Sequence, residues 1–246
     1  MMDKLLNVKE AAALLNVSEM TIRRWTNTGA LNCYRLGKKR ERRFRRQDLQ
    51  QYLAGGVDGA GAGGTADESG RVSLGFAGIE VPDGAHLTHL YFDDEEALGL
   101  QASYVRQGLE KGETVLVIAP DRSREVLWRT LERDGLEVMA FMDRQRLYHD
   151  GGRETPAELA AYIAQIAASA PGRLRLLGDM AWTRSKQWPL ELIRSVEETT
   201  NTRLRAGHLF LCQYGLAEFS GRETMMAVET HRYAIYKGRL RENLLV

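Results

Sequence analysis

The chain has 246 residues, enough for one large domain or two modest ones. It is 43% hydrophobic and 27% charged, as in ordinary globular proteins, and no apolar run approaches the roughly 18 residues of a membrane helix. The net charge of +1 conceals an asymmetry, because residues 1–53 carry 12 Lys and Arg against 5 Asp and Glu, whereas residues 54–246 carry 22 against 28. We expect a small basic module and a larger acidic one, each with its own partners.

The N-terminus and the cysteines exclude two further classes of protein. The first residues lack the apolar stretch and small-residue cleavage site of a secretory signal peptide. Cys33 and Cys212 stand far apart and suggest no disulfide framework. The expected localisation is cytoplasmic, without membrane association.

The first module begins with two predicted helices. Apolar residues from Val8 to Trp25 recur at spacings of three and four, with one break at residues 16–18. Ser18 is placed to cap the second helix, and Gly29 is placed to end it. The pattern predicts two short helices joined by a tight turn.

The segment "LGKKRERRFRR", residues 36–46, contains seven Lys or Arg. It predicts an extended hairpin with a basic tip, in which Phe44 packs inward, followed by a third helix over 46–53. A helix pair followed by such a hairpin is the outline of a winged helix-turn-helix, whose second helix reads the major groove while the wing contacts phosphates. The alternative is a solvated surface without a partner. The residues expected to contact DNA are Ser18, Thr21, Arg23, Arg24, Lys38, Lys39, Arg40, Arg42 and Arg43.

Three motifs in this module resemble the MerR-type and excisionase-type winged helix-turn-helix. They are "VKEAAALLNVS" in the first helix and turn, "TIRRW" in the second helix, and "RRFRRQDL" where the wing closes. The resemblance implies sequence-specific binding of double-stranded DNA. Where MerR activators continue into a long coiled-coil helix, this chain continues into a Gly-rich segment, so their dimer geometry is not expected here.

Residues 54–70 contain seven Gly and four Ala and cannot bury enough apolar surface to offset the entropy of ordering. We predict a flexible linker over 54–75. The expected domains are therefore 1–53 for DNA binding and 76–246 for the acidic module.

The acidic module alternates apolar strands with amphipathic helices, which predicts an α/β fold with a mostly parallel sheet covered on both faces. A closing helix is expected over 221–238. The predicted strands are 86–92, 114–120, 137–142, 173–180 and 208–214, and the predicted helices between them are 94–112, 122–135, 155–172 and 189–204.

Motifs for phosphate binding are missing from this module. The sequence contains neither G-x-x-x-x-G-K-[ST] nor a G-x-G-x-x-G after a strand. Asp179 stands where a Walker B carboxylate would, but without its partner loop it is expected to cap the following segment more often than to hold a phosphate or a metal. No nucleotide cofactor is therefore predicted.

Residues 80–245 resemble the MEDS sensory domain of DcmR-type regulators, which is related to the RecA/KaiC-like fold without its ATPase loop. The resemblance rests on "HLTHLYFDDEEALGLQASYVRQGLEKGETVLVIAP", "LLGDMAW" and "HLFLCQYGLAEFSGRETMMAVETHRYAIYKGRLREN". It implies sensing of small molecules, proposed to be simple hydrocarbon derivatives, with a His and a Cys as metal or ligand contacts. Many relatives carry His-Pro near the C-terminus, where this chain has His231-Arg232.

The candidate ligand residues each have a structural alternative. The acidic run 93–96 can cap a helix or contact a ligand, and the histidines and Cys212 can be packed in a core. A metal site needs three or four ligands. Besides His89 and Cys212, the residues that can complete one if the fold brings them together are His86, Asp179, His208 and His231. The candidates for ligand binding are His89, Tyr91, Asp94, Glu95, Asp179, Trp182, Cys212 and His231.

Two functions from different classes remain open. The first is a transcription regulator without enzymatic activity, in which the helix-turn-helix reads DNA under the control of a small-molecule effector or a metal. The second is a RecA/KaiC-like nucleotide-binding or enzymatic domain localised to DNA. Because one small module covers little DNA, we expect a homodimer or higher oligomer formed by the C-terminal domain or its terminal helix, around Met225–Leu240.

Overall fold

The structure is a computed structural model, and it describes residues 5–15, 17–27, 31, 33–36, 41–46, 49, 70–204 and 207–243. Within these ranges no helix is long and apolar enough to cross a membrane. Of the predicted third helix, 46–53, the residues other than 46 and 49 lie outside the described ranges, as do residues 54–69 of the predicted linker.

The N-terminal domain is a helix-turn-helix with a hairpin wing. A capping box starts the first helix, since Asn7 accepts from the Glu10 N–H and the Glu10 carboxylate accepts from the Asn7 N–H. Buried side chains of both helices, among them Ile22, pack around Phe44, as predicted. The elements are α1 (Val8–Leu15), α2 (Glu19–Asn27), β1 (Tyr34–Leu36) and β2 (Glu41–Arg43), with β1 and β2 antiparallel.

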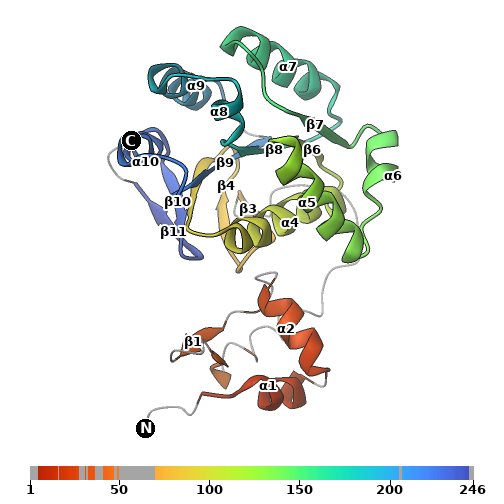
Figure 1. The fold of residues 1–246 in the computed structure, drawn as a ribbon. Helices are drawn as coiled ribbons and strands as arrows, with labels where there is room; N and C mark the ends of the chain where they lie inside the picture. The colour runs from red at the N-terminus through yellow and green to blue at the C-terminus, as the bar shows by residue number, and fades with distance from the viewer. Residues whose placement is uncertain are drawn as a thin grey trace.

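The C-terminal domain is built on a seven-stranded sheet (Figure 1). Its strand order is β11-β10-β5-β9-β8-β6-β7, and all pairs are parallel except β10 with β11. The strands are β5 (His86–Tyr91), β6 (Thr114–Ile118), β7 (Leu147–Asp150), β8 (Leu174–Asp179), β9 (His208–Gly215), β10 (Tyr233–Tyr236) and β11 (Arg239–Glu242).

Helices cover both faces of this sheet, so each face has its own apolar core. One core lies under α4 (Asp94–Glu110), α5 (Asp121–Arg133) and α6 (Val138–Asp143). The other lies under α7 (Pro156–Ser169), α8 (Trp182–Ser185), α9 (Leu190–Arg203) and α10 (Gly221–Thr230). Because side chains alternate along a strand, His86 and His89 of β5 face different cores.

The C-terminal domain starts earlier than the predicted boundary at residue 76. A hairpin of β3 (Arg71–Ser73) and β4 (Glu80–Pro82) precedes β5, and it places buried Val72 and Val81 in the core beneath α4. The predicted linker 54–75 is therefore too long at its C-terminal end. Sequence reading missed this hairpin because each strand has three residues.

Two elements predicted for the C-terminal domain, the strand 137–142 and the closing helix 221–238, are wrong. Residues 137–142 lie mostly in α6, and the strand in that region is the polar β7, since a short apolar run with one β-branched residue does not distinguish helix from strand. The predicted closing helix 221–238 ends at Thr230 and is followed by β10 and β11. Lys237 and Gly238, with φ of 51° and 66°, form the tight turn between these strands.

Candidate metal centre and DNA interface

The start of α2 is stabilised by two residues predicted to contact DNA. The Ser18 hydroxyl accepts from the Thr21 N–H at 3.0 Å and lies 2.9 Å from the Thr21 hydroxyl, so Ser18 is the N-cap of the helix. Arg23 is exposed one turn later and lies 3.6 Å from Glu19, a pair that leaves the guanidinium accessible. The Arg24 side chain lies outside the described residues.

The wing holds two more of the predicted arginines. Arg42 and Arg43 lie half-buried on β2, and Arg43 donates to Glu41 at 2.6 Å, which offsets part of its charge. Fully buried Phe44 follows this strand and forms a bridge of two hydrogen bonds with Leu6, which connects the wing to the segment just before α1. Residues 37–40, with Lys38, Lys39 and Arg40, lie outside the described ranges.

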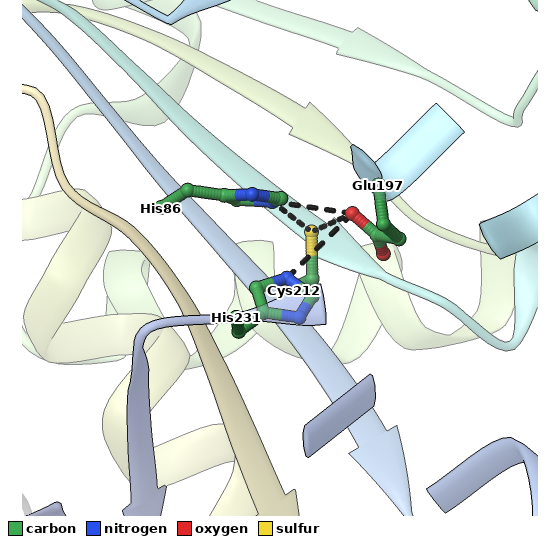
Figure 2. A group of neighbouring side chains, drawn as sticks. All are labelled: His86, Glu197, Cys212 and His231. Atoms are coloured by element: carbon green, nitrogen blue, oxygen red, sulfur yellow. Dashed lines mark hydrogen bonds and ion pairs between the residues drawn. The ribbon is translucent and has the colours of Figure 1, made fainter. Parts of the chain in front are cut away.

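In the C-terminal domain, four side chains from four elements converge beneath the sheet (Figure 2). His86 begins β5, Cys212 lies within β9, Glu197 projects from α9, and His231 follows α10 directly. All four are buried, and one donor atom from each lies within 4.8 Å of every other donor atom. Two of the predicted candidates, Cys212 and His231, belong to this group, which we call the HECH cluster.

The hydrogen bonds of His86 determine which ring nitrogen carries a proton. Its Nδ1 lies 2.9 Å from the Asn201 side-chain oxygen, and the Asn201 amide nitrogen donates to the Thr230 carbonyl, which fixes the amide orientation. His86 Nδ1 is therefore the donor. The Nε2 atom faces Glu197 Oε2 at 3.2 Å and Cys212 Sγ at 3.5 Å.

His231 is arranged in the same way. Its Nδ1 lies 2.8 Å from the Ala227 carbonyl and must donate to it, which leaves a lone pair on Nε2. That Nε2 lies 3.6 Å from Glu197 Oε2 and has no hydrogen-bond partner within the described part of the chain. Both imidazoles thus hold their Nδ1–H on a carbonyl oxygen and direct Nε2 into the cluster, as metal-ligating histidines do.

Burial and neighbouring groups set the charges in the HECH cluster. Burial alone would raise the pKa of Glu197, but hydrogen bonds from His86 and from the Tyr214 hydroxyl lower it below its ordinary value. Burial lowers the pKa of His231 to about 4, so this ring is neutral at pH 7. Burial and the charge on Glu197 raise the pKa of the Cys212 thiol well above its ordinary value. The carboxylate is ionised and the thiol protonated, so a bound cation must displace the thiol proton.

Four of the six donor separations in the HECH cluster match a tetrahedral divalent cation. Typical Zn–N, Zn–O and Zn–S lengths place two donors about 3.3 to 3.6 Å apart across a tetrahedral ion. The His86–Glu197, His86–Cys212, Cys212–Glu197 and His231–Glu197 donor separations are 3.2, 3.5, 3.6 and 3.6 Å. Two imidazoles, one thiolate and one carboxylate suit Zn²⁺ better than Mg²⁺ or Ca²⁺, which prefer oxygen ligands alone.

A small cavity of about 40 Å³ lies against the HECH cluster. His86, Glu197 and Cys212 form its polar side, and its remaining wall is mostly aliphatic and aromatic. Trp182, a predicted ligand-binding residue, lines this cavity together with Trp188. The two rings pack edge-on, with their centroids 4.9 Å apart. The cluster is therefore next to a mostly apolar space.

Gly152 holds the position of Trp182, and an alanine there is expected to destabilise the domain by about 1–3 kcal/mol. Gly152 has a φ of +92°, and a Cβ atom on it would overlap the Trp182 indole ring. Thermal unfolding and tryptophan fluorescence of Gly152→Ala should both change. Gly172→Ala is the matched control, because a Cβ there meets nothing within 4 Å; equal effects of the two variants would contradict the assignment.

The other candidate ligand residues lie outside the HECH cluster. His89 faces the opposite core, where its Nδ1 lies 2.9 Å from the Gln213 amide nitrogen. Asp94 and Glu95 are exposed in the first turn of α4, which Asp93 caps. Asp179 accepts from the Ala181 N–H, in the turn before α8, whose N-cap is Ala181. Tyr91 is buried at the end of β5, and burial raises its pKa.

Sequence reasoning missed Glu197 and gave His86 a secondary place. A usable signal exists for Glu197, because Ile193 and Glu197 are four residues apart and share the buried face of α9. A carboxylate on the apolar face of a helix needs a buried partner, which marks it for function. No comparable signal distinguishes His86 from His208, which lies at the start of β9 outside the cluster.

Comparisons with known proteins agree with both domains. Residues 85–232 match the family model of the MEDS domain, described as "MEthanogen/methylotroph, DcmR Sensory domain", and residues 5–57 match a helix-turn-helix domain. The transcriptional repressor DcmR of Methylorubrum extorquens (strain DSM 6343 / CIP 106787 / DM4) is 31% identical over 252 residues, which cover 98% of this chain and 94% of that protein. The chain therefore belongs to the DcmR-like family and is a DNA-binding transcription regulator with a MEDS sensory domain.

Proposed function

We propose that the HECH cluster is the sensory centre of this regulator and binds a divalent cation, Zn²⁺ in the first place. The observation that carries the proposal is the pair of imidazoles whose Nδ1 protons are held on carbonyl oxygens while both Nε2 atoms face the Glu197 carboxylate, with the Cys212 thiol beside them. When bound, the cation supplies Lewis acidity and an affinity for soft donor atoms of an effector.

The residues around the cluster offer a route from the centre to the rest of the domain. Asn201 of α9 bridges His86 and the Thr230 carbonyl at the end of α10, next to His231. Glu197 and Asn201 lie on the same helix, so a change at the centre acts on the contact between α9 and α10. We propose that this contact carries the signal of metal or effector binding.

We propose further that α2 reads bases and that the wing holds the DNA backbone. Arg23 is exposed for a contact with guanine, and Met20, which is 79% exposed on the same helix, suits a thymine methyl group. Ser18, Thr21, Arg24, Arg42 and Arg43 remain proposed contacts. The similarity to the repressor DcmR extends over nearly the full length of both chains, which supports the proposal that this protein represses transcription by binding to a promoter.

Neutralising the wing tip with Lys38→Ala, Lys39→Ala and Arg40→Ala is expected to weaken binding to all duplexes alike. Each lost phosphate contact should flatten the slope of log affinity against log salt by about 1. Fluorescence anisotropy at several salt concentrations measures this slope. Arg23→Ala should instead reduce the preference of the protein for one duplex sequence over another. An unchanged salt slope in the triple variant would show that the wing does not contact DNA.

Self-association through the C-terminal domain is part of the proposal. The region around Met225–Leu240 is α10 followed by the β10–β11 hairpin at the sheet edge, and Met225 is 55% exposed there. Light scattering of the full chain should give at least a dimer, and Met225→Glu should shift it toward the monomer. A monomeric full chain would exclude this mode of assembly.

The proposed regulator acts in the cytoplasm and is not an enzyme. Its binding to DNA can be tested with the full chain. A duplex selected by the protein from a random pool should bind more tightly than random DNA, and Zn²⁺ should change that affinity. Equal affinity for the two duplexes would contradict the DNA-reading role. Affinity unaffected by Zn²⁺ would contradict the sensory role. Nucleotide turnover would favour the RecA/KaiC-like alternative.

A further inference from the structure

A groove between α7 and α9 lies next to the cavity beside the HECH cluster. The groove encloses about 540 Å³, and most of its exposed lining is apolar. Five residues line both the groove and the inner cavity, so the two spaces share a wall: Leu159, Ile163, Val196, Thr200 and Phe210.

Small side chains keep the groove open on the α7 side. Ala157, Ala160 and Ala164 recur along one face of α7 and are exposed in it. On the α9 side, Val196 precedes Glu197 and Thr200 lies about one turn after it, and all three line the inner cavity. The same helix thus forms a wall of the groove and supplies a carboxylate to the cluster.

The two volumes limit what can bind. A water needs roughly 10–15 Å³, and benzene enters an apolar cavity of about 150 Å³. The inner cavity of about 40 Å³ therefore accepts a few non-hydrogen atoms, and the rest of a longer molecule must lie in the groove. Arg203 and His208 are among the few polar residues of the groove, so its interior favours an aliphatic body over a charged one.

We infer that the α7–α9 groove is the entry route and binding site of the effector, a small molecule with an aliphatic body and one soft donor atom for the metal. This inference rests on the proposed metal centre. In the cavity beside His86, Glu197 and Cys212, the donor atom would replace the Glu197 carboxylate as the fourth ligand of the metal, and the released carboxylate would accept the proton of a thiol donor. The aliphatic body would lie against the α7 alanines. A second copy of the chain is the competing occupant of the groove, but it would not fill the inner cavity.

The test uses the full chain loaded with Co²⁺, whose visible absorption reports its ligands, and a series of primary alkanethiols from ethanethiol to pentanethiol under anaerobic conditions. Affinity should rise about fourfold per added methylene, the effect of burying one CH₂ group. Ala164→Phe should weaken pentanethiol binding at least tenfold, by about the contribution of two methylenes. Ala161→Phe, at an exposed alanine of α7 outside the groove, is the matched control.

A metal-free measurement separates the two proposals. Under xenon, methyl resonances of Ile118, Ile163 and Ile193, which line the cavity, should shift, whereas those of Ile79 and Ile235 in the opposite core should not. Xenon shifts without cobalt absorption bands would contradict the metal centre and leave the route intact. Cobalt bands with no chain-length dependence, or equal effects of the two Ala→Phe variants, would overturn the route. Loss of dimerisation in Ala164→Phe but not in Ala161→Phe would place a second copy in the groove and would also overturn the route.

Discussion

Replacing Cys212 with Ser is expected to lower the affinity of the full chain for Zn²⁺ by more than about 100-fold, since even the loss of a group that only supports a metal ligand costs about 10- to 100-fold. The hydroxyl keeps the shape of the side chain but cannot supply the thiolate that selects Zn²⁺. Competition with a chromophoric chelator measures the affinity. Thermal unfolding gives a second readout, because a ligand at 1,000 times its Kd stabilises by about 4 kcal/mol.

The matched control is Cys33→Ser, which removes the other free cysteine of the described residues, in the helix-turn-helix domain. It should leave Zn²⁺ affinity and the thermal shift unchanged. His231→Gln should behave like Cys212→Ser, because the unpartnered Nε2 is lost. Wild-type affinity in Cys212→Ser would show that the HECH cluster is a buried polar network without a metal.

Glu113→Ala is expected to destabilise the C-terminal domain by about 3–5 kcal/mol, as breaking a buried ion pair does. The Glu113 carboxylate lies 3% exposed and accepts from Arg173 at 3.0 Å and from Arg175 at 2.6 Å. Arg175 is 1% exposed and also donates to the Ser73 carbonyl of β3. Removal of the carboxylate leaves a buried guanidinium without its counter-charge.

The midpoint temperature of thermal unfolding should fall by roughly 6–20 °C in Glu113→Ala. Glu110→Ala removes an exposed partner of Arg106 and should cost no more than about 0.5 kcal/mol. The double variant Glu113→Met with Arg175→Met should recover part of the loss, because it leaves no charge unpaired at that site. A small effect of Glu113→Ala would show that water reaches Arg175.

Periodicity predicted most of the fold because the long elements repeat their burial pattern many times. The helix pair and the parallel strands β5, β6, β8 and β9 all lie where apolar residues recur regularly. Strand β10 escaped prediction because its four residues follow a helix directly and become a strand by pairing with β5. The turn at Lys237 and Gly238 is the signal that identifies it.

The candidate site was predictable in part. Cys212 and His231 are rare residue types in apolar surroundings, and the resemblance to the MEDS domain pointed to a His and a Cys. Their convergence with His86 depends on strand order, which places β5 between β9 and β10. Glu197 looks like a surface charge until the buried face of α9 is known. A sequence read one element at a time does not bring these four together.

X-ray absorption at the zinc edge of the Zn²⁺-loaded full chain tests the proposed centre most directly. The HECH cluster predicts one sulfur neighbour at about 2.3 Å and nitrogen or oxygen neighbours at about 2.0–2.2 Å, with imidazole scattering from two rings. Cys212→Ser should lose the sulfur contribution and Cys33→Ser should keep it. A shell of oxygen atoms alone, or more than one sulfur, would contradict a metal centre built from His86, Glu197, Cys212 and His231.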